Sequence, residues 1–195
     1  MAYKGLRYSR YNVIDAETKK YKYATPKSFG RITTESFSAE YEDVVLRADD
    51  TIAESEKCFK QGTLTVGVAD SDEAQEAELK GSTVTSGEVT KNVDDESPYF
   101  GYGHVIPMKE HGSTIYKVEM FIRCQNSNIT HDANTKGDST EFITTSYENK
   151  VYPLDEAMNG YAVGDWCKVK RFDTLSAAQE YLDGLLTPPV AAGNG

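Results

Sequence analysis

The chain has 195 residues, of which 38% are hydrophobic and 27% are charged, and these proportions predict one globular domain with a buried core. No apolar run approaches the roughly 18 to 20 residues of a membrane span, and the N-terminus lacks the apolar segment of a signal peptide. We therefore expect no membrane partner and folding in a cytoplasm. The cysteines, Cys58, Cys124 and Cys167, lie far apart, which indicates reduced thiols rather than a disulfide framework.

Charged residues are distributed unevenly along the chain. Residues 1–31 contain eight basic and two acidic residues, whereas the whole chain has a net charge of −10. We predict three parts: a basic N-terminal arm over 1–31, a β domain over 32–186 and a flexible C-terminal tail over 187–195. The charge pattern fits either two separately solvated surfaces or an arm of one copy that binds the acidic body of another.

Turn residues recur at short intervals between segments rich in Thr, Tyr, Val, Phe and Ile, which predicts a mainly β architecture. A Gln61-Gly62 turn is expected before a one-sided strand in which Leu64, Val66 and Val68 alternate with small or polar residues. A hairpin that turns through "KEHGS" should carry much of the core. The expected strands are 32–41, 52–59, 63–69, 99–108, 114–123 and 160–169.

Two stretches predict helices. "DSDEAQEAELKG" (70–81) offers Asp70 or Ser71 as the N-cap and Gly81 at the C-terminal end. "DTLSAAQEYLDGLL" (173–186) begins with capping residues and repeats apolar residues at helical spacing. One face of this second helix should therefore pack on the sheet.

No motif of a catalytic centre is visible in the sequence. It contains no Gly-Lys phosphate loop, no G-x-S-x-G turn and no His pair at metal-binding spacing. His104, His111 and His131 stand alone, and adjacent acids such as Asp49 and Asp50 lack the spacing of a calcium loop. We therefore expect a protein without enzymatic activity, cofactor or metal.

The stretch "STEFITTSYEN" (139–149) reads as a strand with no apolar face. Thr140, Phe142 and Thr144 alternate with Ile143 and Tyr147, and the remaining positions are polar. Such a strand predicts neighbours that are themselves half polar.

Five stretches occur along the chain in a fixed order that is informative about its family: "RITTESFSAEYEDVVLRADD", "GTLTVGVAD", "ELKG", "SPYFGYGHV" and "ANTKGDSTEFITTSYENKVY". In this order they resemble the major tail proteins, or tail tube proteins, of long-tailed phages with non-contractile tails (siphophages), in particular the phi-thirteen-type group. The resemblance covers roughly residues 5–186. It implies a β-sandwich or split-barrel protomer with a flanking helix and a C-terminal helix.

The resemblance also implies a function. Such a subunit assembles with itself into hexameric rings, which stack into a tail tube through which phage DNA passes without specific binding. The implied partners are other copies of the chain, the tape measure protein, the tail terminator and the distal tail protein. The implied location is the virion, after assembly in the host cytoplasm.

Three groups of residues are expected to have roles in this tube. The candidates for the wall of the channel are Glu35, Glu40, Glu54 and Glu56. The candidates for contacts between rings are Arg7, Arg10, Lys19, Lys20, Asp49 and Asp50. The candidates for a strand of the tube wall are Thr140, Phe142, Ile143, Thr144 and Tyr147. An acidic channel would keep DNA from adhering, although the same acids could simply solvate an outer edge.

Other functions fit the sequence as well. A tail-like bacteriocin or a secretion system would use the same type of tube subunit. A β-rich adhesin or carbohydrate-binding module would also be acidic and rich in tyrosine, and an unrecognised hydrolase is the third alternative.

Overall fold

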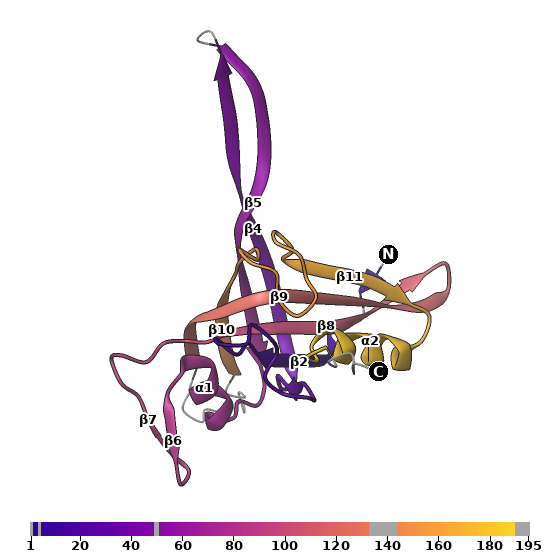
Figure 1. Cartoon of the computed structure of the whole chain (residues 1–195). Coiled ribbons are helices and arrows are strands. Elements are labelled where there is room, and N and C mark those ends of the chain that lie inside the picture. The colour runs from indigo at the N-terminus through magenta and orange to yellow at the C-terminus, as the bar shows by residue number, and fades with distance from the viewer. Residues whose placement is uncertain (1, 4, 49–50, 133–143, 190–195) are drawn as a thin grey trace, which may run out of the picture.

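The computed structural model describes residues 2–3, 5–48, 51–132 and 144–189 (Figure 1). In this part of the chain nine strands form one antiparallel sheet in the order β3-β2-β8-β9-β10-β5-β4, with β1 paired to β8 and β11 paired to β9. The mainly β class predicted from the sequence is confirmed. The strands of the sheet are β1 (Ala2–Tyr3), β2 (Arg7–Val13), β3 (Lys27–Ser28), β4 (Ile32–Ala48), β5 (Thr51–Val68), β8 (Tyr99–Glu110), β9 (Ser113–Asp132), β10 (Thr144–Val151) and β11 (Cys167–Phe172).

The first helix, α1 (Glu73–Lys80), follows β5 and begins slightly later than predicted. Its N-cap is Asp72, whose carboxylate accepts a hydrogen bond from the amide of Ala74. The helix ends at Gly81 in the left-handed conformation, as the sequence predicts. A Cβ at Gly81 would lie 2.1 Å from the carbonyl oxygen of Glu96, so only glycine fits there. A short hairpin of β6 (Thr83–Thr85) and β7 (Glu88–Thr90) follows this helix.

The second helix, α2 (Leu175–Leu185), covers one face of the sheet, and its N-cap is Thr174 (Figure 1). Its buried residues Ala178 and Leu182 belong to a cluster with Val118, Met120 and Ile122 of β9. Phe121 points to the opposite face of β9 because side chains alternate along a strand, and Cys124 joins it after the register shift that separates the Phe100–Cys124 and Tyr102–Phe121 pairs. They join a second, largely aromatic cluster whose members include Tyr11, Phe29, Phe100, Tyr102 and Tyr147.

Residues 7–31 belong to the folded body and not to a separate arm. β2 lies inside the sheet, between β3 and β8. Tyr11, Val13 and Phe29 are part of the aromatic cluster, and Ile14 and Tyr21 are part of the cluster under α2. The number of basic residues did not indicate that this segment contributes to the core, because its apolar residues lie between the basic ones.

β5 is continuous where the sequence predicted a Gln61-Gly62 turn. After a register shift at the preceding pair, Tyr41 of β4 pairs with Phe59 of β5. A Cβ at Gly62 would lie 2.4 Å from Cε2 of Phe37. The glycine therefore permits a close approach across the hairpin and does not reverse the chain.

Two further strands differ in extent from the prediction. β9 continues through the polar stretch 125–132 and there pairs with β10. β11 begins at Cys167, and the residues before it contain an isolated bridge between Met158 and Tyr161.

Candidate assembly surface

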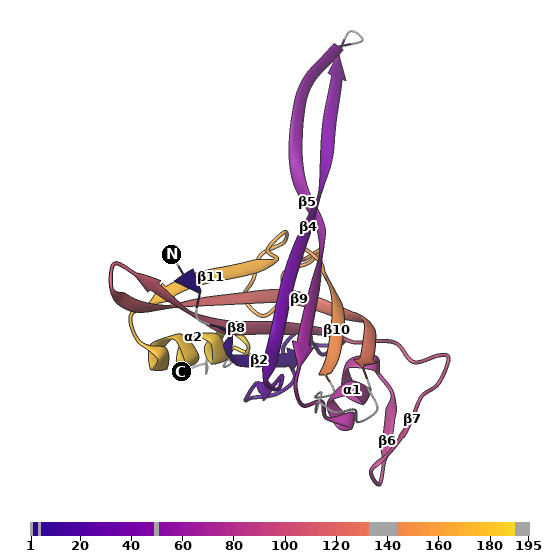
Figure 2. The same cartoon turned by 180° about the vertical axis from the view of Figure 1, so that it is seen from behind.

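The most prominent feature is the β4–β5 hairpin, whose distal half extends beyond the rest of the protein (Figures 1 and 2). At the usual rise of ~3.3 Å per residue, the part of β4 from Tyr41 to Ala48 spans about 25 Å. In the described part of the chain β4 pairs only with β5, so this ribbon has no third strand. A two-stranded ribbon without cover is marginally stable in water, which favours contact with another molecule.

The root of the hairpin is held to the body by a chain of aromatic rings. The ring centroids of Phe37 and Phe121 are 4.8 Å apart, and those of Phe37 and Trp166 are 5.6 Å apart. Phe59 stacks on Trp166 at 4.1 Å with an interplanar angle of 13°. Tyr41 meets the edge of Phe59 at 6.0 Å. Stacked and edge-to-face rings contribute beyond their buried area, so they stabilise the attachment of the hairpin to the body.

The hairpin, β11 and the segment that leads into β11 carry three exposed apolar side chains. Tyr41 is 59% exposed, Val163 64% and Val169 54%. Val163 lies in the loop before β11, and this loop stands beside the hairpin in both views (Figures 1 and 2).

Glu35, a predicted channel residue, is buried in the protomer. Its side chain is 10% exposed. Its Oε2 accepts a hydrogen bond from the hydroxyl of Tyr102 at 2.8 Å, and Nδ1 of His104 lies 3.1 Å from the same oxygen. This short contact is not a hydrogen bond, and neither ring nitrogen of His104 makes one within the described residues. The prediction that Glu35 faces a water-filled channel is wrong for this protomer, because β8 lies across it.

Burial favours the neutral forms of both ionisable groups in this contact. It raises the pKa of Glu35 to about 7, against the opposing hydrogen bond from Tyr102. It lowers the pKa of His104 to about 3, with a smaller contribution from Lys117. A buried, titratable contact therefore joins the strand that carries the hairpin to the centre of the sheet.

The other acidic candidates lie farther along the hairpin. Glu40 is exposed on β4. For Glu54 and Glu56 the structure describes only their positions in β5. Asp49 and Asp50 lie outside the described residues.

The basic candidates for ring contacts differ in their surroundings. Nε of Arg10 lies 3.7 Å from Oδ1 of Asp183, and Nζ of Lys19 lies 2.9 Å from Oε1 of Glu156. Both are therefore engaged within their own protomer. Arg10 is partly buried, whereas Arg7, Lys19 and Lys20 are exposed.

The Thr-rich strand is described from Thr144 onward, so Thr140, Phe142 and Ile143 lie outside the described residues. β10 lies between β9 and β5, inside the sheet. Thr144 is partly exposed, and Tyr147 is fully buried in the aromatic cluster. Tyr147 is therefore a core residue of the protomer.

One face of β10 is buried although it is half polar. Thr145 is 3% exposed and Asn149 is 1% exposed. Nδ2 of Asn149 donates to the carbonyl oxygen of Leu64, and its Oδ1 accepts from Nδ2 of Asn126 at 3.0 Å. These hydrogen bonds offset the cost of burying an amide, which is why an apolar face was not visible in the sequence.

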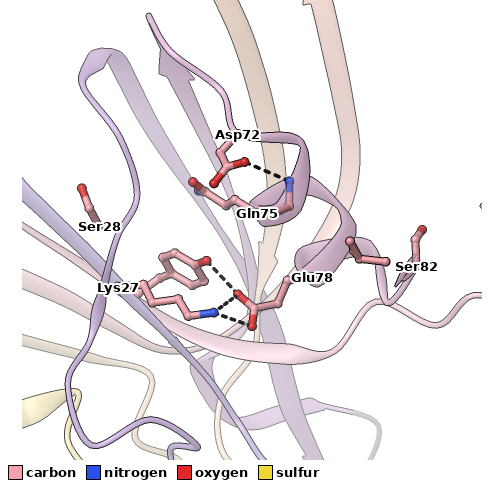
Figure 3. A pocket seen from close by; sticks show the side chains of 9 residues that line it. Lys27, Ser28, Asp72, Gln75, Glu78 and Ser82 are labelled. Atoms are coloured by element: carbon pink, nitrogen blue, oxygen red, sulfur yellow. Dashed lines mark hydrogen bonds and ion pairs between the residues drawn. The ribbon is translucent and has the colours of Figure 1, made fainter. Parts of the chain in front are cut away.

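An open pocket of about 490 Å³ lies between α1 and β3 (Figure 3). Its centre is the carboxylate of Glu78, which accepts hydrogen bonds from Tyr11 at 2.8 Å, from Lys27 at 2.9 and 3.0 Å, and from Tyr23. Although burial acts in the opposite direction, these donors lower the pKa of Glu78. The carboxylate is thus fully engaged and fastens α1 to the N-terminal strands.

The sequence did not predict the stacked aromatic rings at the hairpin root or the burial of Glu35. Phe37, Phe59 and Trp166 come from three different strands or loops, and their contact depends on long-range pairing. A local signal existed in Trp166, the single tryptophan, which follows the turn residues Gly164 and Asp165.

Among the described residues, no group of three or more His, Cys, Asp or Glu side chains could hold a metal ion. Neither described helix has the length and apolar character needed to cross a membrane.

The comparisons with known proteins give structural neighbours at low similarity. No family model and no curated protein matches the chain. The chain is similar to a component of the anti-feeding prophage cap (AFP tube terminating cap), with a TM-score of 0.42 and 8% identity over 83% of this chain and 87% of that one. It is also similar to a component of the anti-feeding prophage (AFP) baseplate, with a TM-score of 0.36 and 8% identity over 88% of this chain and 97% of that one. Both neighbours are parts of the anti-feeding prophage, and a likeness at this level assigns no family to the chain.

Proposed function

We propose that this chain is a structural, non-catalytic subunit of a phage-tail-like tube, in which hexameric rings of the protein stack around a channel for DNA. The observation that carries the proposal is the β4–β5 hairpin, which leaves the body as an uncovered ribbon (Figures 1 and 2). A ribbon of this kind gains cover only from another molecule, and in a homopolymer that molecule is another copy.

The ends of the sheet support the same proposal. In the described part of the chain, β3 and β4 lie at the two ends of the main strand order, from which β1 and β11 branch. Their outer edges present backbone groups that a further strand can pair with. Contacts between unlike surfaces of identical subunits produce closed rings or open stacks, which are the two elements of a tube.

The tube would be part of a virion or of a tail-like particle, assembled in the host cytoplasm. Its partners would be other copies of the chain, a tape measure protein, a tail terminator and a distal tail protein. DNA would pass through without specific binding. Of the predicted channel acids, Glu40, Glu54 and Glu56 are the ones we propose for repulsion of DNA. Tubes that contain or release DNA would separate a phage tail from a bacteriocin or secretion tube.

Negative-stain electron microscopy of the full-length protein tests the proposal. We expect rings or tubes with an open channel, formed by the protein alone or when tail-initiation proteins are added. A monodisperse monomer at every concentration and salt, even with those proteins present, would contradict it.

A shortened hairpin provides the matched variant. Residues 43–57 are replaced by Asn-Gly, which joins Glu42 and Cys58 through a tight turn that suits two paired strands. The body should keep its circular dichroism spectrum, because the removed part lies beyond it, and rings or tubes should be lost. Normal tubes from this variant would show that the hairpin has no part in assembly.

A further inference from the structure

A second pocket lies where the loop after β2, the start of β8, the middle of β9 and the segment after β10 meet. Its lining residues come from 14–19, 96–99, 123–125 and 154–158, and its volume is about 480 Å³. This volume is within the range of sites that hold small molecules. We call it the Tyr99 pocket.

One part of the lining of the Tyr99 pocket is apolar. Ile14, Leu154 and Met158 line the pocket and are buried members of the cluster under α2. Tyr99 is 38% exposed, and the guanidinium carbon of Arg123 lies 4.7 Å from the centroid of its ring. The pocket thus offers a ligand apolar side chains and part of an aromatic ring.

The other part of the lining consists of ion pairs. The guanidinium of Arg123 contacts the carboxylate of Asp155, and Nζ of Lys19 lies 2.9 Å from Oε1 of Glu156. Arg123 lowers the pKa of Asp155, and Glu156 raises the pKa of Lys19. Both pairs are therefore ionised at neutral pH, and each compensates its own charge.

The walls of the pocket are already joined to one another in the protomer. The amide of Ile14 donates to the carbonyl oxygen of Tyr99 at 2.7 Å, and the amide of Tyr152 donates to that of Arg123 at 3.0 Å. Nε2 of Gln125 donates to the carbonyl oxygen of Ser97 at 2.8 Å. A ligand therefore pays little to order the site on binding.

The paired charges favour a neutral ligand that is rich in hydroxyl groups. Carboxylates only accept hydrogen bonds and the cations of Lys and Arg only donate them, whereas a hydroxyl group does both. Hydroxyl groups can therefore bond to both members of each ion pair without separating them. A charged ligand would meet a like charge beside each opposite one, and the further carboxylate of Glu96 disfavours an anion.

A sugar ring combines such hydroxyl groups with an apolar face. The C–H groups on one face of a pyranose carry a slight positive charge, which is attracted to the face of an aromatic ring. We propose that the Tyr99 pocket binds one neutral hexopyranose unit of a glycan, with its C–H face against Tyr99 and its hydroxyl groups at the two ion pairs. The pocket lies within one protomer, so this inference does not rest on the proposed tube function.

Saturation-transfer difference NMR on the full-length protein tests the proposal with four neutral sugars: glucose, galactose, mannose and N-acetylglucosamine. We expect at least one of them to bind with a dissociation constant on the order of 1 mM, because a single ring makes few contacts. Glucuronate and glucose 6-phosphate should bind more weakly. Tighter binding of these two anions would overturn the argument for a neutral ligand, and the absence of binding by all four neutral sugars would overturn the site.

Two variants locate the bound sugar. Tyr99→Ala should weaken binding about tenfold, whereas Tyr41→Ala, which removes another exposed tyrosine, should leave it unchanged. Because Tyr99 also packs on Arg123, the second variant is Glu156→Ala, whose side chain is 56% exposed. It should weaken binding about threefold or more through the lost acceptor, and Glu17→Ala in the loop after β2 is its control.

Circular dichroism checks the fold of each variant. In the wild-type protein we also expect magnetisation transfer between the ring C–H protons of the sugar and aromatic protons that disappear from the spectrum of Tyr99→Ala. Binding that is unchanged in both Tyr99→Ala and Glu156→Ala would place the sugar elsewhere and refute the proposal.

Discussion

Replacing Glu35 with Gln should remove a loss of stability that the wild-type protein undergoes as the pH rises through 7. Burial raises the pKa of Glu35 to about 7 in the folded state, from an ordinary value of 4.5. A group whose pKa is higher in the folded than in the unfolded state stabilises the folded protein when it is protonated. This stabilisation is complete below the pKa of the unfolded state and is lost as the pH rises through the pKa of the folded state. The wild-type protein should therefore be less stable in mild alkali than in mild acid.

The magnitude follows from the two pKa values. Their difference corresponds to about 3 kcal/mol over the full titration, of which about 2 kcal/mol falls between about pH 5.5 and about pH 8.5. The side chain of Glu35 is only 10% exposed, so solvent reduces this value little. With its amide oxygen in the place of Oε2, Gln keeps an acceptor for the hydroxyl of Tyr102. It should therefore fit the site without the charge.

Urea unfolding, followed by Trp166 fluorescence and circular dichroism, measures the effect at the two pH values. The comparison of wild type with Glu35→Gln cancels the contribution of His104, whose lowered pKa acts in both proteins and costs stability as the pH falls. Glu40→Gln removes an exposed carboxylate from the same strand and is the control. If wild type and Glu35→Gln lose the same stability between the two pH values, the burial argument is wrong.

Two further substitutions test the packing. Gly62→Ala should destabilise the protein by about 1–3 kcal/mol, because the added Cβ would lie 2.4 Å from Phe37. Gly184→Ala in α2, where nothing lies within 4 Å, should stabilise it by about 0.5–1 kcal/mol. Urea unfolding measures both changes, and two changes of the same sign would refute the predicted clash at Gly62. Glu78→Gln should lower the free energy of unfolding by about 1–2 kcal/mol at neutral pH, because Lys27 loses its charged acceptor. The difference from wild type should shrink in acid, where Glu78 itself becomes protonated. An unchanged unfolding midpoint would refute the role of Glu78 in fastening α1.

The elements predicted correctly are those with local signals. Both helices carry capping residues and, at α1, the terminal glycine, so their ends could be placed within a few residues. The β8–β9 hairpin was visible because its apolar residues alternate on both sides of a turn. These signals act over a few residues and do not depend on the rest of the fold.

The errors concern positions that depend on distant pairing. Gly62 resembled a turn residue, yet its function is to make room for Phe37 across the hairpin. Glu35 looked like one of several solvated acids, and only the crossing of β8 shows that it is buried beside Tyr102 and His104. Periodicity along one strand carries no information about which strand covers it.

The edge strand β4 explains how an assembly subunit can remain specific without a recognisable motif. A long, flat edge pairs with almost any exposed strand, and proteins usually blunt it with charge or bulges. In β4 the register with β5 shifts between Ile32 and Thr34, between Glu40 and Tyr41, and between Leu46 and Arg47. Each shift bends and twists the edge, so a partner strand must match these irregularities. Another copy of the chain can meet that requirement in every subunit, whereas an arbitrary strand cannot. In the tube that we propose, selectivity would thus come from backbone geometry, which a search for residue motifs does not reveal.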